Sequence, residues 1–146
     1  MEQIKVAVAE KHDILRAYVV DLLKGVDHFE IVFDSFGATD LMDKISRLEV
    51  NVLVLSTSLL GYDGEDALKI IRESDQVPNL KIIMYSNRTD NLSIEDMAKQ
   101  GANSFLNKTA EADEIIESIE TVFKDGYYFN KYFTKEILDS VFTETI

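Results

Sequence analysis

The side chains that could perform chemistry stand at the ends of short apolar runs of the sequence. They are the pair Glu10 and Lys11, the hydroxyls Ser56, Ser58 and Ser86, and Lys108. A serine hydroxyl needs a base or a metal to become a nucleophile, and Glu10 is the only carboxylate among them. Mg²⁺ prefers carboxylate oxygens, whereas the charges of Glu10 and Lys11 cancel. This set therefore offers hydrogen bonds but little support for nucleophilic or metal chemistry.

These residues can meet only if the apolar runs form one sheet. The runs at 4–9, 52–56 and 80–86 are continuous and rich in β-branched residues, as buried strands are, and weaker runs occur at 29–34 and 103–107. Between them, helical spacing predicts helices near 14–23, 41–48, 67–71, 93–100 and 113–124, with a Ser93/Asp96 capping box opening the fourth.

Strands separated by helices cannot form hairpins, and the crossovers are right-handed. The sequence thus predicts a doubly wound α/β domain with a five-stranded parallel sheet and helices on both faces. Such sheets place their site at the carboxyl ends of the strands, where the six residues would gather.

Composition limits the classes of function. The 146 residues suit one domain, and a net charge of −12, from 27 acidic against 15 basic residues, disfavours nucleic acids and anionic membranes. The absence of cysteine removes thiol and disulfide chemistry. No apolar stretch is long enough for a signal sequence or a membrane span, so a cytoplasmic protein is expected.

The last twenty residues differ from the rest. Aromatic residues crowd 127–133, and a helical pattern follows, with Thr134 as its predicted N-cap. One apolar stripe would consist of Phe133, Ile137, Leu138, Val141 and Phe142. We therefore divide the chain into a domain at 1–126 and an extension at 127–146. The extension either packs on its own domain or serves as a dimer contact or a connector to another domain.

Several motifs in a fixed order carry a family resemblance. They are IKVAVAEKHD near the start, NVLVLSTSLLGYDGEDAL, IIMYSN, GANSFLNK, and DGYYFNKYFTKEI near the end. The chain resembles the receiver domains of bacterial two-component response regulators, and most of all those that precede LuxR/NarL-type DNA-binding domains. The resemblance covers residues 4 to about 135. It implies a flavodoxin-like (CheY-like) three-layer α/β/α fold with strand order 2-1-3-4-5.

The resemblance also assigns roles. In the family, an acidic pair and an Asp that ends the third strand hold Mg²⁺, and that Asp accepts a phosphoryl group from a histidine kinase. Position by position, the acidic pair falls on Glu10 and Lys11, the acceptor on Ser56, the phosphate-binding hydroxyl and lysine on Ser86 and Lys108, and the aromatic switch on Phe105. Lys11 and Ser56 depart from this pattern.

We therefore expect a degenerate phosphorylation pocket of Glu10, Lys11, Ser56, Ser58, Ser86 and Lys108, with Ser86 and Phe105 as switch residues. No catalytic residue is expected, and Mg²⁺ binding should be lost or weak, with Glu10 as a weak candidate ligand. Lys108 should turn to Glu10, or to Ser56 and Ser86, while Lys11 should reach into the metal position. Asp13 is expected to cap the first helix, and His12 and His28 to be loop residues without a catalytic role.

The expected function is a signalling module and not an enzyme. Such a receiver would act independently of phosphorylation through protein contacts, as a homodimer, and regulate transcription through a DNA-binding domain absent from this chain. One alternative is a phosphorylatable, Mg²⁺-dependent receiver that uses Glu10, Asp13 or Asp63. Another is a nucleotide- or flavin-binding enzyme, although the loop AEKHD after the first strand has neither a GxGxxG nor a Walker pattern.

Overall fold

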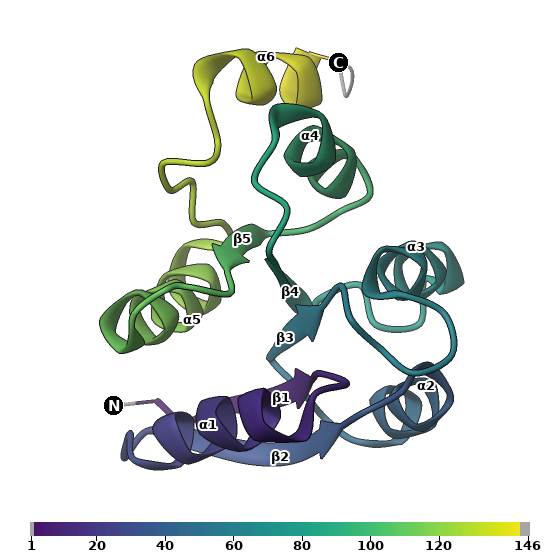
Figure 1. Cartoon of the computed structure of the whole chain (residues 1–146), viewed down its shortest axis with the longest axis vertical. Coiled ribbons are helices and arrows are strands. Elements are labelled where there is room, and N and C mark those ends of the chain that lie inside the picture. The colour runs from purple at the N-terminus through teal and green to yellow at the C-terminus, as the bar shows by residue number, and fades with distance from the viewer. Residues whose placement is uncertain (1, 144–146) are drawn as a thin grey trace.

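One parallel sheet forms the middle layer of the chain (Figure 1). The computed structural model describes residues 2–143. The strands are β1 Ile4–Ala9, β2 Phe29–Ser35, β3 Val52–Ser56, β4 Lys81–Ser86 and β5 Ser104–Asn107. All neighbouring strands pair in parallel, in the order β2-β1-β3-β4-β5. The predicted doubly wound sheet and its strand order 2-1-3-4-5 are confirmed.

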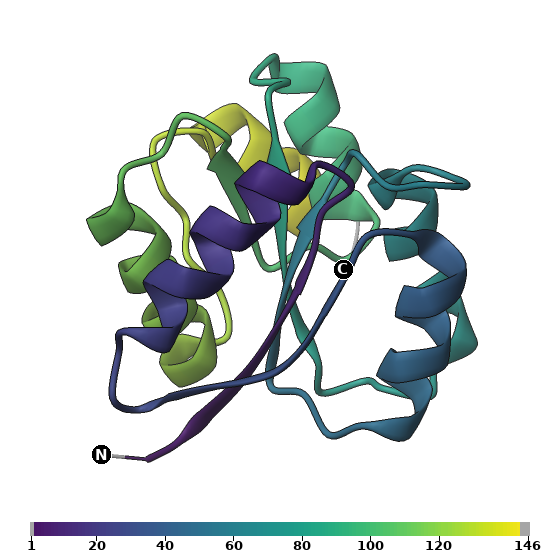
Figure 2. The same ribbon diagram turned by 60° about the horizontal axis from the view of Figure 1, so that its bottom comes forward.

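Helices cover both faces of this sheet, as Figure 2 shows for α1 and α5 on one side and α2 and α3 on the other. The helices are α1 Asp13–Lys24, α2 Ala38–Arg47, α3 Gly64–Ser74, α4 Asn91–Lys99, α5 Ala112–Asp125 and α6 Lys135–Thr143. None of these helices is both long and apolar enough to cross a membrane, a finding that covers residues 2–143.

Two hydrophobic cores result from the alternation of side chains along the strands. On β3, Val52 and Val54 join the core beneath α1 and α5, whereas Leu53 and Leu55 join the core beneath α2, α3 and α4. All four side chains are buried. Because both faces of the strand are covered, its sequence is a continuous apolar run and not an alternating one.

Two predicted helix starts were wrong. The N-cap of α4 is Asp90, whose carboxylate accepts a hydrogen bond from the Ser93 backbone N–H at 3.0 Å, so the helix begins three residues earlier than the Ser93/Asp96 box required. Asp13 does not cap α1 either. It is the first residue of that helix, where its carboxylate pairs with Arg16 Nη2 at 2.8 Å.

The extension packs on its own domain, beside β5 and α4 (Figure 1). Asn130 Nδ2 donates to the Phe105 carbonyl of β5 at 2.6 Å, and the side chains of Phe133 and Ile137 are buried in the core that α4 covers. Thr134 acts as the predicted cap, because its Oγ1 accepts from the Ile137 N–H at 3.3 Å. The Phe142 side chain and residues 144–146 lie outside the described structure. The domain boundary at 126 stays a prediction.

Candidate functional site

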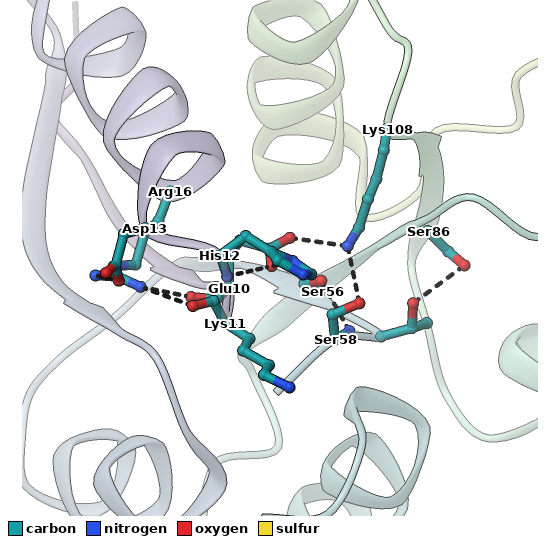
Figure 3. A network of polar contacts seen from close by, with 10 residues as sticks. Glu10, Lys11, His12, Asp13, Arg16, Ser56, Ser58, Ser86 and Lys108 are labelled. Atoms are coloured by element: carbon teal, nitrogen blue, oxygen red, sulfur yellow. Dashed lines mark hydrogen bonds and ion pairs between the residues drawn. The ribbon is translucent and has the colours of Figure 1, made fainter. Parts of the chain in front are cut away.

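The carboxyl ends of four strands bring polar side chains together at one edge of the sheet (Figure 3). This strand-end cluster consists of Glu10, Ser56, Ser58, Ser86 and Lys108. Glu10 directly follows β1, Ser56 and Ser86 are the last residues of β3 and β4, and all three are completely buried. The structure therefore gathers five of the residues that the sequence selected.

The cluster is centred on an ion pair between Glu10 and Lys108. Lys108 Nζ lies 2.9 Å from Glu10 Oε1 and donates to Ser58 Oγ at 3.1 Å. Burial by itself raises the pKa of Glu10, but hydrogen bonds from the His12 backbone and from Lys108, together with the Lys108 charge, outweigh it and lower the pKa below its usual value. The lowered pKa keeps the buried carboxylate charged, with the Lys108 ammonium group as its counter-ion.

His12 belongs to the same network, which sequence reasoning missed. Its backbone N–H donates to Glu10 Oε2 at 2.9 Å, and its ring Nδ1 lies 3.0 Å from the same oxygen. Glu10 stands two residues before His12, the N-cap of α1, and a side-chain oxygen at this spacing can accept a hydrogen bond from the backbone N–H two residues later. This spacing was the sequence feature from which the contact could have been predicted. Both oxygens of Glu10 are therefore engaged, one by Lys108 and one by His12.

The hydroxyls of the cluster are occupied by neighbouring groups. Ser56 Oγ accepts from the Ser58 N–H at 2.9 Å, and a hydrogen bond from Ser56 also lowers the pKa of Glu10. Thr57 Oγ1 donates to Ser86 Oγ at 3.2 Å, and Ser86 Oγ accepts from the Arg88 N–H at 3.1 Å. Through these hydrogen bonds the Ser56 and Ser86 hydroxyls stabilise the turns that follow β3 and β4.

A close approach fixes the end of β3. A Cβ placed on Gly64, the first residue of α3, would lie 1.9 Å from the Ser56 carbonyl oxygen. Only glycine allows α3 to begin this near the strand end, because any other side chain would overlap the backbone. Gly64 thereby fixes how closely α3 approaches Ser56.

Three other charged residues from the sequence analysis stay outside the cluster. The Lys11 side chain is exposed and extends away from Glu10 (Figure 3), and its expected reach into the metal position stays a prediction. Asp13 pairs with Arg16, and Asp63 caps α3 by accepting from the Asp66 N–H at 2.9 Å. In the described part of the chain, no group of three or more His, Asp or Glu side chains could hold a metal ion.

Phe105, the predicted aromatic switch, lies between the sheet and the extension. Its side chain is 1% exposed, and its ring meets that of Tyr132 edge to face, with the centroids 5.1 Å apart. His28, expected to be a plain loop residue, lies 2.6 Å from a carboxylate oxygen of Glu120 on α5. Neither contact joins the strand-end cluster, and the switch role of Phe105 stays a prediction.

Known proteins resemble this chain in sequence and in fold. It is 21% identical to the transcriptional regulatory protein DegU of Brevibacillus brevis over 136 residues, which cover 93% of the chain but 57% of DegU. It is 26% identical to the chemotaxis protein CheY of Listeria monocytogenes over 121 residues, or 83% of the chain and 99% of CheY. The chain thus spans little more than half of the first relative and nearly all of the second.

A solved structure of the response regulator RcsB from Salmonella typhimurium superposes with a TM-score of 0.79 at 18% identity, over 98% of this chain and 68% of that one. At this identity the likeness shows the fold alone. The response regulator receiver domain family itself matches residues 6–120, most of the chain. Receiver domains are signalling modules of two-component systems, and this chain belongs to the response regulator receiver domain family.

Proposed function

We propose that this receiver signals without the phosphorylation cycle of its family, as a module held in one state by its own side chains. The observation that carries the proposal is the buried ion pair of Glu10 and Lys108 at 2.9 Å. It lies beside Ser56, the residue on which the resemblance places the acceptor position of the family. According to this proposal, Lys108 no longer binds a phosphoryl group and is instead permanently paired with Glu10.

The residues present do not fit Mg²⁺. This ion needs one or more carboxylates that are free to bind it, together with water. Glu10 Oε1 is held by Lys108 and Oε2 by His12, so a cation at Glu10 would have to compete with an ammonium group 2.9 Å away. Lys11, on which the resemblance places the second acid of the family pair, is exposed and cationic, and Ser56 brings no charge.

Ser56 is also a poor phosphoryl acceptor. Its hydroxyl is completely buried, and its oxygen accepts from the Ser58 N–H at 2.9 Å. Glu10 is the nearby carboxylate that could act as a base, but its lowered pKa makes it a weaker one and its oxygens are already engaged. Attack on phosphorus would require the hydroxyl to become exposed and Glu10 to lose its partners.

The output would pass through protein contacts. In this proposal the chain is the regulatory part of a transcription regulator, pairs as a homodimer, and reaches DNA through a separate domain outside residues 1–146. The support is the match to 57% of DegU, which is a transcriptional regulatory protein, and the net charge of −12, which disfavours direct DNA contact by this segment. The extension at 127–146 would then connect the two domains.

The test is incubation with acetyl phosphate and Mg²⁺, followed by intact-mass measurement. We expect no added phosphoryl group on the unaltered chain. The double variant Lys11→Asp/Ser56→Asp should acquire one, because it regains the acceptor and the second metal ligand, whereas Lys11→Asp alone should not.

Phosphorylation of the unaltered chain would contradict the proposal and favour a Mg²⁺-dependent receiver with unusual ligands. Loss of that phosphoryl group in Ser56→Ala would place it on the serine. Its survival in Ser56→Ala and loss in Glu10→Gln would place the reaction on the acid.

A further inference from the structure

Arg72 is unlike the other arginines of this acidic chain. The sequence has four, and Arg16, Arg47 and Arg88 each form an ion pair with a carboxylate. Arg72, on α3, has no carboxylate within ion-pair distance among residues 2–143, although the chain carries 27 acidic residues. Its guanidinium is partly buried, and burial lowers the pKa of Arg72.

Neutral groups hold the Arg72 side chain in place. Nε donates to the Gly101 carbonyl at 3.0 Å, and Nη2 donates to Asn103 Oδ1 at 2.8 Å. Gly101 has a φ of +105°, and a Cβ there would come within 3.0 Å of Arg72 Cγ and Nε. These bonds use two of the five guanidinium N–H groups, and Nη1 finds no acceptor in the described part of the chain. The cation is thus positioned but not neutralised.

A cavity of about 310 Å³ lies beside this guanidinium, at the end of the sheet opposite to the strand-end cluster. It is lined by Arg72, Lys81, Asp75, Tyr127, Val77 and Pro78, among others. Lys81, the first residue of β4, makes no ion pair among the described residues. Two cations therefore face one carboxylate over an apolar and aromatic wall, in a volume at the lower end of the usual range for ligand sites.

We propose that this cavity binds a small organic anion, a carboxylate or a phosphate ester with a compact ring or apolar part. Arg72 and Lys81 would hold the anionic group, and Val77, Pro78 and Tyr127 would contact the rest. Arginine suits this role because its planar N–H groups match carboxylate and phosphate oxygens. The site is independent of the strand-end cluster, so it stands whether or not that cluster accepts a phosphoryl group.

Such a ligand would sit against the start of the extension. Tyr127 lines the cavity, and Asn103, which holds Arg72, also donates through Nδ2 to the Gly126 carbonyl at 2.9 Å. A ligand bound in the cavity would therefore connect α3 and β4 to residues 126 and 127, which directly follow α5. The bound anion would then serve as the input signal of a receiver that does not respond to phosphorylation.

The test uses benzoate and phenyl phosphate as anionic probes and benzamide as the neutral counterpart. Each is titrated into the ¹⁵N-labelled chain while the amide signals of Gly101 and Asn103 and the Arg72 Nε–H signal are followed. We expect saturable shifts with at least one anion and none with benzamide. A preference for phenyl phosphate would assign the phosphate-ester class, and a preference for benzoate the carboxylate class.

The cavity is tested with substitutions of Lys81 and Asp75 and not of Arg72, because Arg72→Gln would also remove the hydrogen bond to the Gly101 carbonyl and could unfold this region. Lys81→Gln should weaken binding roughly tenfold, the loss of one charged hydrogen bond. Asp75→Asn should strengthen it, because it removes the one facing carboxylate and Asn suits the φ of 55° there. Lys69→Gln, an exposed lysine of α3 outside the cavity, is the matched control. Absence of saturable shifts, equal binding of benzamide, or equal effects of the Lys81 and Lys69 substitutions would overturn the proposal.

Discussion

Replacement of Lys108 with Met would leave the buried Glu10 carboxylate without its cation. Removing one partner of a buried ion pair destabilises a protein by about 3–5 kcal/mol, because the other charge stays uncompensated. Glu10 would keep the hydrogen bond from the His12 N–H at 2.9 Å, so we expect the lower limit, about 3 kcal/mol near neutral pH. Since domains of this kind have about 5–15 kcal/mol of stability, the variant should still fold.

The pH dependence of this loss tests its cause. In the unaltered chain the pKa of Glu10 is lowered, so its contribution to stability is present above the unfolded-state pKa and lost as pH falls through the folded-state pKa. Without Lys108 the largest remaining influence is burial, which raises the pKa. The variant would then bind a proton more readily when folded than when unfolded. The difference in stability between the two proteins should therefore shrink as the solution is acidified.

Guanidinium chloride unfolding of both proteins at several pH values measures this difference. The double variant Lys108→Met/Glu10→Gln should regain most of the lost stability, because no buried charge remains. Arg47→Met is the control, since the exposed Arg47–Asp43 pair at 2.9 Å should contribute little to stability. A loss below about 1 kcal/mol for Lys108→Met, or a loss that does not shrink on acidification, would refute the reasoning.

Three further substitutions test how the fold positions the cluster and the extension, each by denaturant unfolding. Gly64→Ala should destabilise the chain by about 3 kcal/mol, because its Cβ would overlap the Ser56 carbonyl, and a neutral effect would contradict that close approach. Phe133→Ala should cost about 3 kcal/mol and Phe129→Ala much less, since their exposed fractions are 8% and 43%; equal losses would argue against docking of the extension. Asp90→Ala should cost about 1 kcal/mol and speed hydrogen exchange in the first turn of α4, whereas unchanged exchange would exclude Asp90 as its cap.

The convergence of the cluster was predictable from local patterns. Continuous apolar runs marked the strands, and the helices between them required a parallel sheet, whose carboxyl ends had to gather Glu10, Ser56 and Lys108. The family resemblance left two arrangements open for Lys108, an ion pair with Glu10 or hydrogen bonds to Ser56 and Ser86. In the structure the second partner of Lys108 is Ser58, because the turn after β3 directs the Ser58 hydroxyl toward the Lys108 ammonium group. The spacing of residues along the sequence does not reveal the direction of a side chain in a turn.

Other features depend on contacts that no local pattern carries. The His12 ring reaches Glu10 through the geometry of the loop before α1, although its side chain is 63% exposed and looked like a plain loop residue. The bond from Arg72 to Asn103 joins residues 31 positions apart and depends on the packing of α3 against the chain before β5. The cap of α4 was misplaced because Asp90 and Ser93 are both good N-cap residues, and only the backbone path chooses between them.

In this proposal Glu10 keeps Lys108 as its permanent counter-ion, so that the strand-end cluster does not take up Mg²⁺. A titration with MgCl₂, followed through the amide signals of Glu10, Ser56 and Lys108 and corrected with a matched NaCl titration, tests it most directly. We predict no saturable shift in the unaltered chain and a saturable shift in Lys11→Asp/Ser56→Asp. A saturable shift in the unaltered chain that disappears in Glu10→Gln would contradict the account.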